Sequence, residues 1–124
     1  MKQETKDFLL QTGYRMWKEK VDSIGVVQNY QKRVDSQYPN APLCSSNEKL
    51  FINITYYSYH LPDGGMSEGF EVYLAHGIES DIWCNLKIYS VSEQQIVDDL
   101  YQLEGKLIKM WEVFCNSEEE VEWK

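Results

Sequence analysis

The sequence predicts an α+β domain in which helices flank a three-stranded antiparallel meander, in the order α-α-β-β-β-α. Two observations lead to this fold class. Apolar residues recur with a helical period near both ends of the chain, and between residues 50 and 88 they alternate with a period of two. The turns between the alternating segments are short, which favours antiparallel neighbours. The length of 124 residues fits a single domain, residues 1–124.

The N-terminal third is expected to form two helices. Five apolar residues lie four, three, four and three positions apart, a spacing that places them on one helical face. They are Leu10, Tyr14, Trp17, Val21 and Ile24. Gly25 is expected to end or kink this helix, and a second, shorter stripe follows at Val27, Tyr30 and Val34. Residues 36–47 contain Pro39 and Pro42 and predict a loop.

Three alternating segments then predict β-strands at residues 50–59, 70–75 and 82–89, with turns at 61–68 and 77–80. We expect the register in which residues of the same face lie opposite each other across each pair of strands. The numbers of two paired residues then sum to 130 in the first hairpin and to 158 in the second. In this register Glu71 lies beside Lys87, and an opposite-charge pair across two strands is favourable.

The last helix is expected from Glu93 to Phe114. Ser92 and Gln95 form a capping-box signature, which marks a helix N-terminus. An apolar stripe follows, at Ile96, Leu100, Leu103, Leu107, Trp111 and Phe114. We expect this stripe to pack on the even-numbered face of the sheet, which carries Ile52, Ile54, Val72, Leu74, Leu86 and Ile88. Residues 116–124 include four Glu and predict a mobile acidic tail.

The net charge of −8 is distributed unevenly: residues 1–40 carry +2 and residues 41–124 carry −10. A field of this sign repels nucleic acid and attracts a basic protein. No apolar run approaches the roughly 18 residues that cross a bilayer, which predicts no membrane partner. The charged N-terminus lacks the apolar core of a signal peptide, and three cysteines without CxxC spacing do not indicate a disulfide framework. We therefore expect a cytoplasmic protein.

The residues with catalytic or metal-binding chemistry do not form a recognisable site. His60 and His76 are expected at opposite ends of one hairpin, too far apart to share a metal ion. Asp98 and Asp99 are adjacent on a helix and so point in different directions. The glycines at Gly64 and Gly65 lack the lysine and helix of a phosphate-binding loop. The sequence thus predicts no enzyme, no catalytic or metal-binding residues and no cofactor.

The odd-numbered face of the predicted sheet is the candidate binding surface. It is rich in aromatic residues, at Phe51, Tyr57, Tyr59, Tyr73, Trp83 and Tyr89. Tyr and Trp among few charges are typical of protein interfaces. The alternative is that the N-terminal helices cover this face and the aromatic residues belong to the core. The predicted partner-binding residues are Trp83, Tyr73 and Tyr57, with Glu79 and Asp81 in the turn beside Trp83.

The overall pattern resembles the small acidic bacterial immunity proteins of toxin–immunity systems. The likeness rests on the chain length, on residues 81–90 and on the closing helix down to Trp111. It implies a cytoplasmic protein that neutralises a cognate, basic toxin by occluding its active site, and it leaves the oligomeric state open.

Three other classes were compared with this pattern. A phage-encoded DNA-mimic inhibitor of a host defence enzyme and a secretion chaperone are also acidic, and both remain alternatives. A double-stranded RNA-binding domain has a similar order of elements but needs basic residues at the start of its last helix. Here residues 92–99 of the chain are acidic, which excludes that class.

Overall fold

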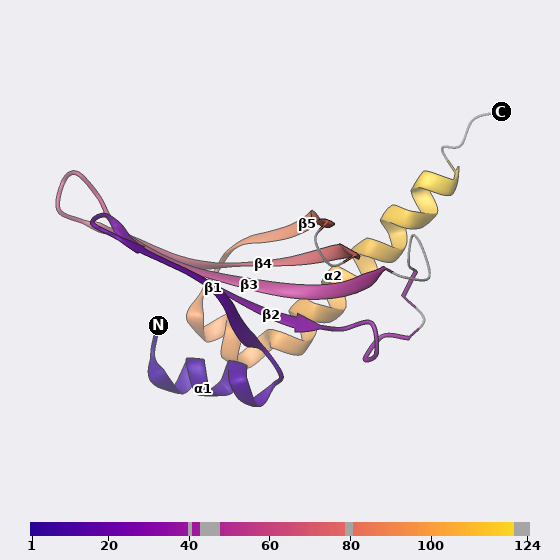
Figure 1. Cartoon of the computed structure of the whole chain (residues 1–124), viewed down its shortest axis with the longest axis horizontal. Helices are drawn as coiled ribbons and strands as arrows, with labels where there is room; N and C mark the ends of the chain where they lie inside the picture. Colours follow the sequence, from indigo (N-terminus) through magenta and orange to yellow (C-terminus); the bar gives the residue numbers. More distant parts are fainter. Residues whose placement is uncertain (40, 43–47, 79–80, 121–124) are drawn as a thin grey trace.

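The chain folds as an antiparallel five-stranded sheet with two helices on one side (Figure 1). The structure is a computed structural model that describes residues 1–39, 41–42, 48–78 and 81–120, without the side chains of residues 78, 81–85, 89 and 116–120. The elements are α1 Gln3–Gln11, β1 Arg15–Asp22, β2 Gly25–Arg33, β3 Lys49–His60, β4 Met66–Ile78, β5 Asp81–Val91 and α2 Glu93–Glu120. Neighbouring strands follow one another along the chain, so the sheet is a meander. No helix in the described ranges is long and apolar enough to cross a membrane.

The α+β class and the antiparallel meander are confirmed, but the expected order α-α-β-β-β-α is wrong at its start. The predicted three-stranded sheet is too narrow, because residues 15–33 form the hairpin β1–β2 instead of helices. Helix α1 ends at Gln11, where Gly13 adopts a φ of +101° and the Thr12 hydroxyl bonds to the Phe8 carbonyl at 3.0 Å. A positive φ is favourable only for glycine, so Gly13 stops the helix inside the predicted stripe.

The turn between β1 and β2 explains why the chain reverses at residue 23. Asp22 Oδ1 accepts hydrogen bonds from the amides of Ile24 at 2.9 Å and Gly25 at 3.1 Å, a side-chain turn typical of Asp. At Gly25 a Cβ atom would lie 2.2 Å from the Ser58 carbonyl oxygen on β3. Glycine therefore allows β2 to approach β3 at the start of their pairing.

The register between β3 and β4 differs from the expected one by four residues. Asn53 pairs with Tyr73 and Leu50 with His76, so paired numbers sum to 126 instead of 130. The turn is tighter than residues 61–68, because Leu61 N donates to Gly65 O at 2.7 Å and β4 begins at Met66. A shift of four keeps every side chain on its predicted face.

Between β4 and β5 the register shifts twice, once between Phe70 and Val72 and once between Leu74 and Ala75. Tyr73 is therefore the residue opposite Lys87, whereas the predicted register placed Glu71 there. The ion pair of Glu71 and Lys87 still forms, diagonally, with 3.4 Å between Oε2 and Nζ.

The closing helix packs on the even-numbered side of the sheet, which we call the helix face. The capping box is confirmed: Gln95 N donates to Ser92 Oγ at 3.1 Å, and Ser92 N donates to Gln95 Oε1 at 2.9 Å. Leu107 and Trp111 are fully buried, and Leu103 is partly buried. Helix α2 extends to Glu120, beyond the predicted end at Phe114, and its dihedral angles are non-helical at Asp99. Of the predicted mobile tail 116–124, residues 121–124 lie outside the described residues.

Helix α1 lies beside the start of α2 on the same face. The Glu93 carboxylate accepts hydrogen bonds from Thr5 Oγ1 at 2.6 Å and from the Lys2 amide at 2.7 Å. Leu9 is fully buried in the same core as the helix-face residues of β3 and β4. Both helices therefore share one hydrophobic core.

This packing predicts unequal effects for two substitutions on α2. We expect Leu107→Ala to lower the free energy of unfolding by about 2–5 kcal/mol, because it leaves a cavity in the core. Val113, which is 61% exposed on the same helix, is the matched control. For Val113→Ala we expect a change within about 0.5 kcal/mol. Denaturant titration of both variants checks this, and equal losses would contradict the packing.

Candidate functional site

The odd-numbered side of the sheet is turned away from both helices, and we call it the open face (Figure 1). Across β2, β3 and β4 its rows join Val27, Tyr57 and Gly69, then Asn29, Thr55 and Glu71, then Gln31, Asn53 and Tyr73. Lys87 of β5 continues the last row. The helices lie on the opposite side, so they do not cover the aromatic residues described here.

The tyrosines of the open face are held in place by glycines on the adjacent strands. The rings of Tyr57 and Tyr59 are stacked, with centroids 5.9 Å apart and planes at 24°. Tyr57 leans onto β4, where a Cβ atom at Gly69 would lie 2.8 Å from its hydroxyl. Tyr59 contacts Gly25 on β2 in the same way, with 2.7 Å from Tyr59 Cδ1 to such an atom. The two rings are therefore fixed by the sheet beneath them.

A polar network continues the open face toward β5. Thr55 Oγ1 donates to Asn29 Oδ1 at 2.5 Å and lies 3.3 Å from the Tyr73 hydroxyl. The Lys87 ammonium lies 5.4 Å from the Tyr73 ring centroid, a cation–π contact. Asn53 is only 3% exposed, and its Oδ1 has no hydrogen-bond partner among the described residues. The middle of the open face is thus polar and ordered, with an aromatic pair at one end.

The structure places the predicted partner-binding residues in different ways. Tyr57 and Tyr73 both lie half-buried on the open face, but they belong to different rows. The Cα atom of Trp83 pairs with His76, whereas the predicted register placed Trp83 opposite Ala75, and the register shift between Leu74 and Ala75 accounts for the difference. Glu79 lies outside the described residues, as do the side chains of Asp81 and Trp83.

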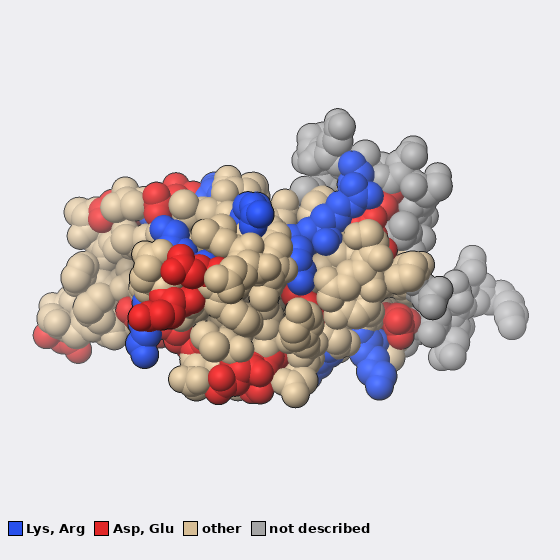
Figure 2. All heavy atoms as spheres, turned by 90° about the horizontal axis from the view of Figure 1, so that it is seen from below, with Lys and Arg blue, Asp and Glu red and all other residues tan. Residues whose placement is uncertain are grey.

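Charge on the described surface is mixed. Acidic and basic side chains are interspersed on the side that the helices cover (Figure 2). On the open face, Lys87 pairs with Glu71, and Lys20 lies 4.0 Å from Asp22. Six of the 20 acidic residues, at 79, 81, 118–120 and 122, have side chains outside the described part.

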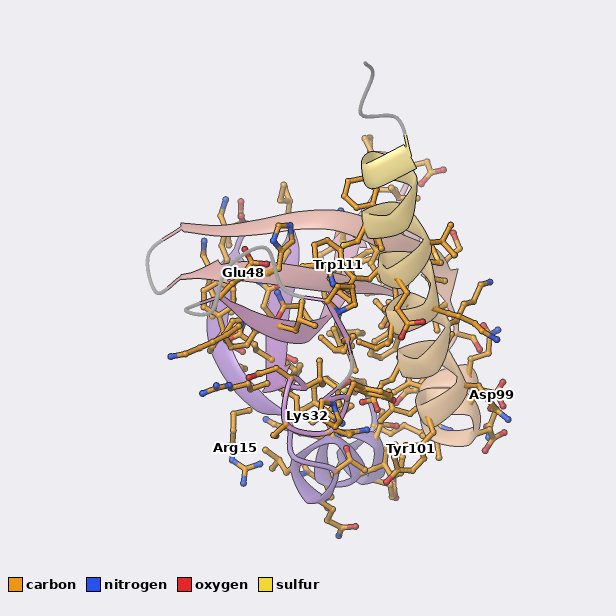
Figure 3. All side chains as sticks on the ribbon, turned by 90° about the vertical axis from the view of Figure 1, so that its right-hand side faces the viewer. Arg15, Lys32, Glu48, Asp99, Tyr101 and Trp111 are labelled. Atoms are coloured by element: carbon orange, nitrogen blue, oxygen red, sulfur yellow. The ribbon has the colours of Figure 1, made fainter. Side chains whose placement is uncertain are left out.

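A buried polar cluster ties the first half of the chain to α2. Glu104 is fully buried, and its carboxylate accepts hydrogen bonds from Tyr14 at 2.6 Å, Lys32 at 2.5 Å and Gln37 at 3.3 Å. Lys32 points from β2 toward the helix (Figure 3), and its ammonium lies 4.8 Å from the Tyr14 ring centroid. Burial raises the pKa of the Tyr14 phenol far above its ordinary value, and the Glu104 carboxylate raises that pKa further.

These groups satisfy one another, so the cluster acts as a structural tie between β2, the residue before β1, and α2. Sequence reasoning missed it, although a signal was present. Glu104 lies four residues after Leu100 and four before Ile108, both buried, so its side chain shares their helix face. A carboxylate in that position requires a cation on the facing strand, and Lys32 provides it.

The two histidines lie far apart. His76 pairs across the sheet with Leu50, whereas His60 is at the other end of β3. His76 Nδ1 is 3.0 Å from Glu48 Oε1, and its ring is 4.5 Å from that of Trp111, whose indole donates to the Pro42 carbonyl (Figure 3). Within the described ranges, no three His, Cys, Asp or Glu residues are grouped to hold a metal ion.

Comparison with models of protein families, with curated proteins and with solved structures found no match.

The buried cluster predicts non-additive effects on stability. Glu104→Leu should lower the free energy of unfolding by about 3–5 kcal/mol, because it leaves the Lys32 ammonium buried without its carboxylate. Adding Lys32→Leu should recover at least about 1 kcal/mol of that loss. Gln102→Leu, at an exposed position of α2, is the control. Losses that simply add in the double variant would show that the pair is not coupled.

The raised pKa of Tyr14 predicts a stability change in alkaline solution. Above pH 10, roughly, the unfolded phenol loses its proton while the folded one keeps it, so the free energy of unfolding falls as pH rises. Tyr14→Phe removes this contribution and should flatten the slope by up to about 1.4 kcal/mol per pH unit. Denaturant titrations between about pH 9 and 11 measure it. An unchanged slope in Tyr14→Phe would contradict the buried, protonated phenol.

Proposed function

We propose that the chain is a non-catalytic, cytoplasmic binding protein that neutralises a partner protein, in the manner of bacterial immunity proteins, and that the open face makes the contact. The observation that carries this proposal is the composition of a sheet face that neither helix covers. Tyr57, Tyr59 and Tyr73 lie there between Asn and Thr side chains. Tyrosine is enriched among the residues that dominate protein–protein binding, and polar neighbours are typical of such surfaces.

The rigidity of this face also supports a binding role. The stacked pair of Tyr57 and Tyr59 is braced against Gly69 and Gly25, and Tyr73 is held by Thr55 and Lys87. Side chains that are already ordered lose little conformational entropy when a partner binds. An aromatic surface of this kind can therefore convert contact area into affinity.

Charge acts mainly at long range in this proposal. The net charge of −8 would steer a basic toxin toward the chain, while the paired charges of the open face contribute little to affinity. Glu79, Asp81 and Trp83 remain proposed contacts at the β4–β5 end of the sheet. Because steering is screened by salt, the association rate should fall between low and physiological ionic strength.

The test begins with the product of the gene beside this one, expressed as the candidate toxin. Co-expression of the chain should restore growth, and the purified pair should bind. Tyr57→Ala with Tyr73→Ala should weaken the affinity about 30-fold or more, because two anchors are lost. The control pair, Tyr101→Ala with Val113→Ala, removes exposed side chains from α2 and should leave affinity unchanged.

Folding must be separated from binding in this experiment. If the folded fraction of the tyrosine double variant binds the partner as tightly as the original sequence, then the open face is not the interface, whether or not the variant is less stable. If only the control pair weakens binding, the interface lies on α2. Binding of a host defence enzyme that acts on DNA, in place of a toxin, would favour the DNA-mimic inhibitor. Binding of an unfolded secreted client would favour the secretion chaperone.

A further inference from the structure

The apolar stripe of the N-terminal third lies largely on the surface. Of the residues that a helix would have buried together, only Tyr14 is in the core. The others are partly or largely exposed: Leu10 40%, Trp17 53%, Val21 65% and Ile24 59%. Met16, beside Trp17, is 40% exposed. Exposed large apolar residues gathered in one segment mark interaction sites more often than isolated ones do.

This segment contains β1, which is an edge strand of the sheet. In the described part of the chain β1 pairs only with β2, and all eight of its residues are exposed. Alternate backbone N–H and C=O groups of an edge strand point away from the sheet and can pair with another strand. Trp17 lies at the register shift between Met16 and Lys18 and has no Cα partner on β2. A bare backbone edge and an exposed indole therefore occur together.

The side chains of β1 differ between its two sides. Lys18 pairs with Asn29 and Lys20 with Val27, which places both lysines on the open face. Met16 and Val21 pair with Tyr30 and Val26, on the helix face. A strand added at this edge would thus meet Lys18 and Lys20 on one side, with Asp22 beside Lys20, and Met16 and Val21 on the other, with Glu19 between them. The positive charge of residues 1–40 in the sequence has its structural counterpart here.

A second copy of the chain is disfavoured when the pair is centred on the middle of this edge. Two identical strands that pair antiparallel about a two-fold axis bring residues of the same face together. Centring such a pair on Lys18 or Lys20 sets that lysine against itself, and centring it on Glu19 sets two glutamates together and Lys18 against Lys20. Only a pair centred nearer the end of the strand, on Val21, sets Lys20 against Asp22. Like charges directly across strands are unfavourable. Lysines and bulges are also the features with which proteins discourage edge-to-edge association.

We propose that β1 binds an extended segment of a partner protein as a sixth strand, and that the acidic and apolar side chains of this segment alternate. Its acidic side chains would face Lys18 and Lys20, its apolar ones would face Met16 and Val21, and the Trp17 indole would cover it. The lysines make the edge selective, because they disfavour the binding of segments that carry no carboxylates to match them. The site is the β1 edge and does not include Tyr57 or Tyr73, so it can fail separately from the proposed function.

The probe is a synthetic peptide of alternating Asp and Val, titrated to about 1 mM into the full chain while backbone amide NMR shifts are followed. We expect shift changes in Arg15–Asp22, the β1 strand, and not in α2. A peptide of alternating Lys and Val tests the charge, and one of alternating Asp and Pro tests the backbone pairing, because proline lacks the N–H donor. Both should bind at least tenfold more weakly, equivalent to about 1.4 kcal/mol.

Two variants locate the site. Trp17→Ala and the pair Lys18→Glu with Lys20→Glu should each weaken Asp–Val binding tenfold or more, whereas Tyr57→Ala with Tyr73→Ala should not. If Trp17→Ala destabilises the fold, the affinity of the double variant Lys18→Glu with Lys20→Glu for the Asp–Val peptide provides the test. The proposal is overturned if the Asp–Val peptide does not bind, if its chemical-shift changes map away from β1, or if the Lys–Val peptide binds equally well. It is also overturned if sedimentation shows that the chain is a dimer and that Trp17→Ala converts it to a monomer.

Discussion

Both helices occupy the same face of the sheet, and this constraint determines the rest of the molecule. A single layer of helices covers one face of each central strand, so Ile52, Ile54 and Leu74 lie in the core on that face. The Glu104 carboxylate makes the arrangement specific, because it bonds to Tyr14 and Lys32 from the N-terminal third. In the described part of the chain β1 pairs only with β2, so it is the outermost strand.

The surfaces available for binding follow from that layering. The open face keeps its tyrosines because no second helical layer covers it, and β1 keeps its bare edge because the meander begins there. One surface carries the tyrosines, and the other offers backbone groups beside lysines. A partner could engage both, since they meet along β2, and two linked contacts bind more tightly than either alone.

Much of the second half of the fold could be predicted from the sequence, because its signals are local. The capping box at Ser92, the apolar stripe of α2 and the face assignment of β3 and β4 depend on residues close together in the chain. The register could not be predicted, since it depends on the tightness of the turn at Gly64 and on two shifts between β4 and β5. Tyr57 and Tyr73 were placed on the correct face for the same local reason.

The N-terminal hairpin could not be recognised, because its helix-face positions are not uniformly apolar. Gln28 and Lys32 interrupt the alternation of β2, and Lys32 is explained only by Glu104, far away in the sequence. The helical spacing of the stripe from Leu10 to Ile24 is a coincidence. Much of this stripe lies on an edge strand, which does not need a buried face. Gly13 within that stripe was the one local signal against a continuous helix.

The central claim is that residues 15–33 form an outer hairpin that leaves an apolar stripe exposed. Nuclear Overhauser contacts between backbone protons test it most directly. The structure predicts cross-strand contacts between Lys18 and Asn29 and between Lys20 and Val27. A continuous series of helical contacts between residues three apart, from Tyr14 to Ile24, would contradict the account and return the stripe to the core.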